Sequence, residues 1–290
     1  MRRGVVGIAV ASLLGALACT NSSSSGTSTS INPNEPTPIQ ACSDLARARC
    51  MRLAACSSVA FAIRYADEAS CEAREQDSCL IALAAPYTGN DVTFVETCAN
   101  ALNGDVDCAS LLAGVPPDGC KARFGLLPNG ATCGFDAQCF STYCNVGPST
   151  VCASCAPAPV AGASCASTFC GETLTCSPIS QTCGTPMPVG ASCDPAPCVA
   201  GTVCAGLAGA RTCQPVAATA AAGQPCGVVN GLRVECAAGG LCKLLPGTTG
   251  TCIAAAADGA TCDVINGPPC AAPARCVAGT CQSSGAGGCQ

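Results

Sequence analysis

Histidine is absent from the 290 residues, only 3% of them are aromatic, and 11% are charged. Without histidine no Ser/His/Asp or Cys/His catalytic arrangement can form. The chain also lacks a basic patch of the kind that binds nucleic acid. We therefore expect no enzyme, no cofactor and no nucleic-acid partner.

Branched aliphatic and phenylalanine side chains are scarce in the second half of the chain. Residues 156–290 contain only twenty Leu, Ile, Val and Phe in 135 positions. This share is below the one-in-five level at which chains usually stop folding by burial alone. Thirty-one cysteines compensate for the missing core. Since one disulfide contributes about 2–4 kcal/mol, several per segment can replace it. We therefore expect a small disulfide-rich fold that matures in an oxidising compartment.

The N-terminus has the pattern of a secretion signal. Arg2 and Arg3 precede an uncharged apolar stretch, Gly4 to Ala18, whose fifteen residues are fewer than the roughly 20 that span a bilayer. We expect residues 1–18 to be a signal peptide. Cys19 follows small Ala18, and the segment resembles a bacterial lipobox, although Ala16-Leu17-Ala18 also satisfies an ordinary cleavage site. Lipidation of Cys19 would leave thirty cysteines that can all pair, whereas simple cleavage would leave an odd thiol, so we favour lipidation.

Residues 19–40 are expected to form the lipidated cysteine and a flexible tether. The segment is rich in Ser, Thr, Asn and Pro and has too few apolar side chains to fold. By resemblance to Gram-negative lipoproteins, Thr20 after the lipidated cysteine implies transfer to the outer membrane. We therefore expect a bacterial cell-envelope protein whose membrane contact is an N-terminal lipid; a secreted protein is the alternative.

Residues 41–120 are expected to form a helical domain stapled by cysteines. Thr37-Pro38 suits a helix start, with a threonine N-cap and proline in the first turn. Further helices are expected over Asp67 to Leu83, from Asn90 or Asp91 to a left-handed cap at Asn103-Gly104, and over Asp107 to Ala113. The region holds eleven acidic and five basic residues, against six of each in residues 121–290. Its eight cysteines are an even set that allows four internal bridges: Cys42, Cys50, Cys56, Cys71, Cys79, Cys98, Cys108 and Cys120.

Residues 121–290 are expected to form five tandem cysteine modules, with boundaries 121–158, 159–186, 187–216, 217–254 and 255–290. Each module opens with Gly-x-x-Cys, and these motifs recur every 28 to 36 residues, as in a modular array. The glycine permits a turn with positive φ. Each module takes four cysteines in the expected template: Cys133, Cys139, Cys144, Cys152; Cys165, Cys170, Cys176, Cys183; Cys193, Cys198, Cys204, Cys213; Cys226, Cys236, Cys242, Cys252; and Cys262, Cys270, Cys276, Cys281.

The last two cysteines of each module flank a turn with hairpin spacing. Cysteines directly opposed on one face can bridge back to the first two, which gives a 1–3, 2–4 pattern, although other pairings stay open. Cys155 and Cys289 fall outside the template. They either pair with each other or rearrange the first module.

The array resembles the Dickkopf N-terminal cysteine-rich family and its relatives in predicted lipoproteins of myxobacteria. The resemblance covers roughly residues 98–290 and rests mainly on cysteine spacing. It implies an extracellular binding or structural role. The matching positions are Cys120, Gly125, Leu127, Gly130-Ala-Thr-Cys133, Gln138-Cys139, Tyr143-Cys144 and Cys152-Ala-Ser-Cys155.

Three short motifs have a chemical reading and a structural one. Cys152-Ala-Ser-Cys155 has the spacing of a redox pair or half a zinc site, but it lacks a βαβ setting, a second close pair and histidines, so we expect structural disulfides and no metal. Asp105-Val-Asp107 lacks the remaining ligands of a calcium loop, and helix capping is favoured. Glu72, Glu75 and Asp77 would need a cleft to act as paired carboxylates, and a solvated helix face is favoured.

The sequence names no catalytic residue. We expect a lipid-anchored extracytoplasmic protein with a binding, adhesion or envelope-structural role toward a protein or carbohydrate ligand, because variable loops on a fixed scaffold are where binding concentrates. The alternative is an inhibitor of secreted hydrolases that presents a rigid loop. A third class, an enzyme seated in residues 41–120, has no residue to support it.

Overall fold

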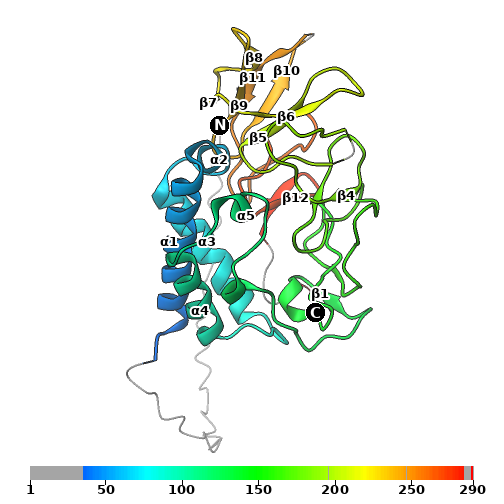
Figure 1. Cartoon of the computed structure of the whole chain (residues 1–290). Coiled ribbons are helices and arrows are strands. Elements are labelled where there is room, and N and C mark those ends of the chain that lie inside the picture. Colours follow the sequence, from blue (N-terminus) through cyan, green and yellow to red (C-terminus); the bar gives the residue numbers. More distant parts are fainter. Residues whose placement is uncertain (1–34, 195, 246, 284–288, 290) are drawn as a thin grey trace, which may run out of the picture. The chain divides into compact units, whose positions relative to one another are not determined.

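The computed structural model describes residues 35–194, 196–245, 247–283 and 289. The expected signal peptide, Cys19 and nearly all of the expected tether lie outside these residues. Helices occupy the first third of the described chain, and short antiparallel hairpins occupy the rest (Figure 1). The predicted disulfide-rich fold class, helical at the N-terminus and hairpin-based after it, is confirmed.

The first helix, α1 (Pro38–Cys56), begins at the predicted threonine cap. The Thr37 hydroxyl accepts the Gln40 N–H at 3.2 Å, and Pro38 occupies the first turn, where its missing N–H costs nothing. The helix therefore starts inside residues 19–40, which the sequence assigns to the tether. A short helix that the sequence analysis did not foresee, α2 (Ser58–Arg64), follows at once, because Ser57 is extended and its hydroxyl accepts the Ala60 N–H at 3.1 Å.

Aspartates cap the three remaining α-helices. Asp67 accepts the Ser70 N–H at the start of α3 (Glu68–Ala84), and Asp91 accepts the Phe94 N–H at the start of α4 (Val92–Asn103), both at 2.7 Å. Asp107 caps α5 (Cys108–Leu112). A carboxylate at this position satisfies free N–H groups and complements the helix dipole.

The left-handed cap expected at the end of α4 is wrong. Gly104 follows the helix as predicted, but its φ is −73°. The carbonyls at the end of the helix accept hydrogen bonds from a side chain instead: Arg52 of α1 donates to the Leu102 carbonyl at 3.0 Å and to the Gly104 carbonyl. A side chain from a neighbouring helix thus does what a left-handed glycine does elsewhere.

Four disulfides hold the helices to one another. The bonds Cys42–Cys79 and Cys50–Cys71 fasten α1 to α3 in antiparallel register. Cys56 bonds to Cys108 at the start of α5, and Cys98 of α4 bonds to Cys120, the last residue of the 3-10 turn η1 (Asp118–Cys120). The eight cysteines of this region are therefore bonded among themselves, as their even number allowed.

The modules are built from short hairpins. Among the described residues, modules 1, 2, 3 and 5 each hold one two-stranded sheet, and module 4 holds five strands in the order β10-β11-β8-β9-β7, where β7 and β9 are the parallel pair. A second 3-10 turn, η2 (Asp136–Gln138), lies in module 1. The strands are β1 (Thr132–Cys133), β2 (Ala153–Ser154), β3 (Thr175–Cys176), β4 (Cys183–Gly184), β5 (Thr202–Ala205), β6 (Thr212–Pro215), β7 (Ala218–Ala220), β8 (Pro225–Val229), β9 (Leu232–Cys236), β10 (Leu241–Leu244), β11 (Thr249–Ile253), β12 (Arg275–Val277) and β13 (Thr280–Gln282).

One hydrogen-bonding scheme repeats in all five modules. The opening glycine donates its N–H to the carbonyl of the module's last hairpin cysteine, as from Gly190 to Cys213 at 2.8 Å, and that cysteine donates back to the residue after the glycine, here Ala191 at 2.9 Å. Every opening glycine has positive φ, between 78° and 89°, as the sequence predicts. The positions are Gly130, Gly162, Gly190, Gly223 and Gly259.

Modules 2 to 5 have the 1–3, 2–4 disulfide pattern. In module 3, for example, Cys193 bonds to Cys204 and Cys198 to Cys213, and Cys204 lies directly opposite Cys213 in the hairpin. The third and fourth cysteines are cross-strand partners in every one of these four modules, which is the arrangement that the hairpin spacing predicted.

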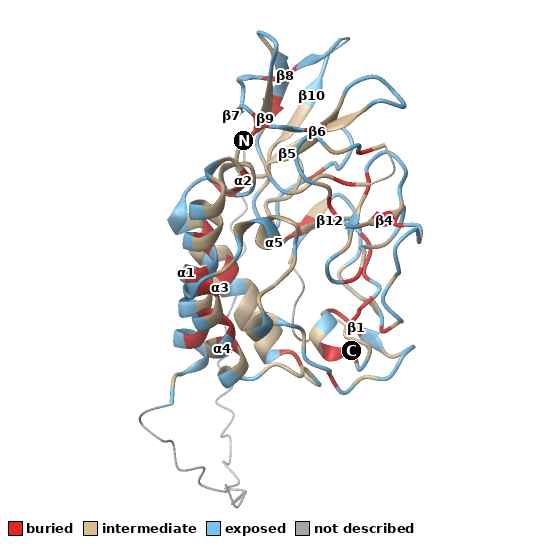
Figure 2. Cartoon of the chain, in the orientation of Figure 1, coloured by how far each residue is buried: buried red, intermediate tan, exposed pale blue. Residues whose placement is uncertain are grey.

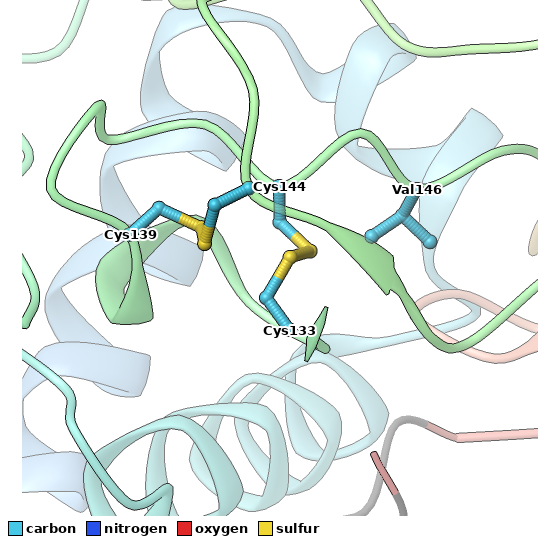
Figure 3. Packing of buried hydrophobic residues seen from close by; sticks show 5 residues of the cluster. Cys133, Cys139, Cys144 and Val146 are labelled. Carbon is cyan, nitrogen blue, oxygen red and sulfur yellow. A yellow bond between two sulfur atoms is a disulfide. The ribbon is translucent and has the colours of Figure 1, made fainter. Parts of the chain in front are cut away.

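Module 1 departs from the expected template. Cys133 bonds to Cys144, but Cys139 bonds to Cys155, which lies opposite Cys144 and so holds the fourth position assigned to Cys152 (Figure 3). Cys152 lies in the hairpin loop and bonds to Cys289, 137 residues further along. The two cysteines left over therefore rearrange the first module, and the end of the chain is bonded to its first repeat.

Sulfur fills the interior that aliphatic side chains fill in other proteins. Among the described residues, the largest side chains with less than 2% exposure are ten cysteines and Ser177. Buried positions are scattered in short stretches through the helices and the modules (Figure 2). The buried side chains form several small clusters, such as Cys226, Cys236 and Cys252 in module 4. The described part of the chain has small clusters in place of one large core, and the disulfides therefore provide much of its stability.

Backbone hydrogen bonds fix the modules to the helices. In module 1 the Ala137 carbonyl accepts the Gly89 N–H at 2.7 Å. In module 3 the Ala200 N–H donates to the Leu112 carbonyl, and in module 4 the Ala238 N–H donates to the Ala62 carbonyl, both at 2.9 Å. Residues 36–290 accordingly form one compact unit. The modules therefore pack against the helices and do not form an extended chain of independent domains.

Candidate functional site

A groove of about 510 Å³ lies between the helices and the last two modules. One wall runs from Arg64, the last residue of α2, through the connection to α3 and on to Arg74 in the first half of α3. The other wall comes from modules 4 and 5 and consists mostly of alanines: Ala221, Ala222, Ala237, Ala238, Ala254, Ala255, Ala257, Ala271 and Ala272. Its volume is in the range of small-molecule sites.

Alanines create the hollow because their side chains leave space between backbones that are held apart by cross-links. The Cys236–Cys252 and Cys270–Cys281 disulfides fix the two segments that carry these alanines. Ala256 and Ala271 also form a backbone bond at 2.9 Å, donated by Ala271. The groove is therefore preformed by rigid backbone.

Two residues that line the groove, Arg64 and Tyr65, belong to an ion-paired cluster around Glu75 of α3. Arg49 of α1 donates to Glu75 Oε2 at 2.6 Å, and Arg64 of α2 contacts Oε1 at 3.3 Å. The Tyr65 hydroxyl donates to the same Oε1, and the Arg64 guanidinium lies 5.3 Å from the centre of the Tyr65 ring. One buried carboxylate thus ties three helices together and orients the residues that line the groove.

Charge and burial act against each other at Glu75. Burial alone would raise the pKa of Glu75, but the positive charges of Arg49 and Arg64 and the Tyr65 hydrogen bond outweigh it and hold that pKa below its ordinary value. Burial, followed by the neighbouring Glu75 carboxylate, raises the pKa of Tyr65. At neutral pH the site therefore holds an ionised Glu75 and a neutral tyrosine.

Two arginines give the groove its electrostatic character. The Arg64 side chain is 52% exposed, so a guanidinium face stays accessible beside the alanines. Arg74 is less exposed and pairs with Asp258 of module 5 at 3.1 Å, where Ser283 also donates to Asp258 at 3.2 Å. This arrangement suits a ligand with an apolar part for the alanines and a hydrogen-bond acceptor for Arg64.

A second hollow, of about 310 Å³, lies between α1 and α4. Burial and the nearby Asp44 raise the pKa of Glu96. One Glu96 oxygen is the single buried side-chain oxygen or nitrogen without a hydrogen-bond partner among the residues that the structure describes. This carboxylate lines the hollow with Arg47 and Asn100, and the apolar side chains of Ala48, Met51 and Ala99 line it as well.

The structure separates the acids that the sequence grouped together. Glu75 is buried and ion-paired, so its assignment to a solvated helix face is wrong, whereas Asp77 is exposed. The paired arginines that bury Glu75 come from α1 and α2, and no local pattern links them to α3. Asp107 caps α5, as the helix-capping interpretation requires.

Cys152 and Cys155 are not bonded to each other. Cys152 is joined to Cys289 and Cys155 to Cys139, so the Cys-x-x-Cys spacing is structural. In each module three cysteine sulfurs lie within 4.8 Å of one another. They belong to two adjacent disulfides, and a metal would require the reduced thiolates.

Comparison of the chain with protein-family models, curated proteins and solved structures gives no match. The likeness to Dickkopf-type repeats therefore stays an expectation from cysteine spacing. Within the described part of the chain, no helix has the length and hydropathy of a bilayer span. Fifteen disulfides indicate an extracytoplasmic location.

The sequence did not reveal the groove. The alanines of its module wall come from four separate segments that meet only in the folded chain. The signal that could have drawn attention is the run Ala254-Ala-Ala-Ala257, which is too small to pack a core and is separated by Asp258 alone from the opening glycine of module 5.

Proposed function

We propose that this chain is a lipid-anchored binding protein of the bacterial cell envelope, which holds a protein or carbohydrate ligand in the alanine-lined groove. The observation that carries the binding role is the preformed groove of about 510 Å³ with the Arg64 guanidinium at its edge. A rigid site loses little entropy when a ligand binds.

Cysteine parity supports the anchor. The fifteen disulfides use thirty of the thirty-one cysteines, and the remaining one is Cys19. A secreted chain with a single leftover cysteine directly after a small residue suits lipidation. Thr20 rather than aspartate in the next position favours the outer membrane.

Intact mass of the membrane-extracted protein tests the anchor. We expect a diacylglyceryl or triacyl adduct on Cys19, removal of residues 1–18, and no thiol alkylation before reduction. The Cys19→Ser variant serves as the control and should appear without lipid. An unmodified Cys19, or several free thiols, would contradict the anchor.

Photocrosslinking on living cells tests the groove. Benzoylphenylalanine at Ala254, inside the groove, should give a discrete adduct, and the same residue at exposed Leu232 of module 4 should not. The added substitution Ala222→Trp, which fills the groove, should abolish the adduct. Equal labelling at Ala254 and Leu232 would contradict a ligand site in the groove.

One observation favours the alternative of a hydrolase inhibitor. Leu207 is 83% exposed at the tip of the β5–β6 hairpin, and both strands of that hairpin are held by disulfides. A rigid loop with one protruding apolar side chain suits a protease pocket. The whole chain should then inhibit a protease at stoichiometric concentration, and Leu207→Gly should relieve the inhibition. Indifference of a broad protease panel would remove this alternative.

A further inference from the structure

Four large apolar side chains lie exposed on or beside module 1. The exposed fractions are 56% for Tyr87, 68% for Phe124, 74% for Leu126 and 68% for Phe140. Since the whole chain has only six phenylalanines and three tyrosines, this concentration stands out. We call these four residues the aromatic patch. Adjacent exposed apolar side chains of this kind usually mark an interaction site.

The patch is held rigidly. The Phe124 and Phe140 rings are stacked with centroids 5.6 Å apart, and Leu126 donates its N–H to the Tyr87 carbonyl at 3.0 Å. Gly89 lies against the Phe124 carbonyl so closely that a Cβ there would collide with it. Backbone contacts between module 1 and the loop that joins α3 to α4 therefore bring the four residues close to one another.

The patch lies at the end of the helices where the chain enters the folded unit. α1 runs antiparallel to α3, because Cys42 near the start of α1 bonds to Cys79 near the end of α3. The loop 85–91 joins α3 to α4, and Val95 of α4 packs on Ala41 and Cys42. Tyr87 is thus at the same end as Pro38. Ile39, 65% exposed, adds a fifth apolar side chain there.

Charge is nearly absent from the segments that form the patch. Residues 85–90 carry none, and residues 124–151 carry only Asp136, which accepts the Cys144 N–H at 2.7 Å. At the edge, Arg123 pairs with Asp91 at 2.9 Å. Placing this surface in an apolar environment would therefore desolvate few charges, and the cost of burying it is low.

We propose that the aromatic patch docks onto the surface of the phospholipid bilayer to which Cys19 is anchored. The inference rests on the proposed lipid anchor. Residues 20–36 can extend at most about 60 Å, so the end of the molecule that they enter stays near the bilayer. Aromatic side chains favour the membrane interface, where an apolar surface inserts roughly 5–10 Å. Docking would orient the body and turn the opposite, module 4 end outward.

Tryptophan fluorescence of the full lipidated chain tests the docking, because the sequence contains no tryptophan and each introduced one is a unique reporter. The chain is reconstituted into vesicles of phosphatidylethanolamine, phosphatidylglycerol and cardiolipin, with and without brominated acyl chains. Phe140→Trp should shift to shorter wavelength and be quenched by the brominated lipid. Leu232→Trp, at a position of module 4 that is also exposed, should show neither effect.

A second arm measures the energy of docking without the anchor. The Cys19→Ser chain should bind weakly to the same vesicles. Adding Phe124→Ser should lower its partition coefficient by roughly tenfold, because transfer of one phenylalanine side chain from water to an apolar environment favours binding by at least that factor. Leu232→Ser should leave it unchanged. Both replaced side chains are exposed, so neither variant is expected to unfold.

The outcomes separate the two proposals. A chain that lacks lipid and does not float with vesicles would contradict the anchor. A chain that floats through its lipid while Phe140→Trp stays in water would overturn the docking alone. A spectral change that grows with protein density and ignores brominated lipid would place a second copy on the patch, and would also overturn it.

Discussion

Each module opens with a glycine in a left-handed backbone conformation that other residues adopt only at a cost in free energy. Gly190, for example, has φ +83°, and a Cβ added there would meet no atom within 4 Å. Space is therefore not the constraint. Any cost of substitution comes from the left-handed conformation itself, which asparagine tolerates better than alanine and β-branched residues tolerate least.

The loss of stability on substituting Gly190 should therefore depend on how readily the new residue adopts positive φ, and not on the size of its side chain. We expect Gly190→Ala to lower the free energy of unfolding by about 1 kcal/mol, Gly190→Asn by less, and Gly190→Val by more. Denaturant unfolding with the disulfides intact measures the series. Equal losses for all three would contradict the account.

Glu75 is a buried, ion-paired carboxylate whose ionisation stabilises the fold. Its folded pKa lies below the ordinary value, so its ionised form stabilises the fold at neutral pH. That stability is fully present above the unfolded pKa and is lost as pH falls through the folded pKa. Glu75→Gln should cost about 2–3 kcal/mol at pH 7 and progressively less in acid.

The measurement is denaturant unfolding of wild type and Glu75→Gln from pH 7 down to pH 3. The two curves should converge at low pH. Asp77→Asn, an exposed acid two residues away, is the matched control and should change little at any pH. A constant gap across the pH range would show that Glu75 contributes packing rather than charge.

At the scale of elements, the hairpin and its two disulfides form the unit of stability. In module 3, the Cys198–Cys213 bond closes a separation of 15 residues and buries Cys213 completely. Removing it as Cys198→Ala with Cys213→Ala should cost about 3 kcal/mol. Amide exchange should accelerate in β5 and β6 while α1 and α3 stay protected. Acceleration spread evenly over the helices would contradict a local unit.

Local chemistry made some elements predictable and hid others. Thr37, Asp91 and Asp107 predicted helix starts because a cap is a contact over three residues. The β8–β9 hairpin was missed although Asn230-Gly231, both with positive φ, is a strong hairpin signal. Its strands lie inside a module that the sequence defines by cysteine spacing alone.

The candidate site was out of reach of such local signals. Glu75 meets Arg49 across 26 residues, and the groove alanines come from segments that only tertiary contacts bring together. Cysteine counting predicted the disulfide-rich fold class and favoured the 1–3, 2–4 pattern, but it assigned the fourth position of module 1 to Cys152 instead of Cys155, three residues away in the same hairpin.

At the scale of the whole molecule, the Cys152–Cys289 bond closes the array on itself. It joins residues that are 137 positions apart in the sequence. Eight further disulfides lie within that loop, so the length of chain that is free to move in the unfolded state is much shorter. Replacing both cysteines with serine should cost about 3 kcal/mol. Thermal unfolding measures the loss, and limited proteolysis should then release a C-terminal fragment first. Unchanged stability would mean that contacts with the helices already hold the array closed.

The central claim is that disulfides, rather than a large apolar core, keep residues 36–290 folded. Small-angle scattering before and after complete reduction and alkylation, without denaturant, tests it most directly. We predict that the radius of gyration rises from about 18 Å toward the roughly 55 Å of an unfolded chain of this length. A reduced and alkylated protein that keeps its native radius would contradict the account.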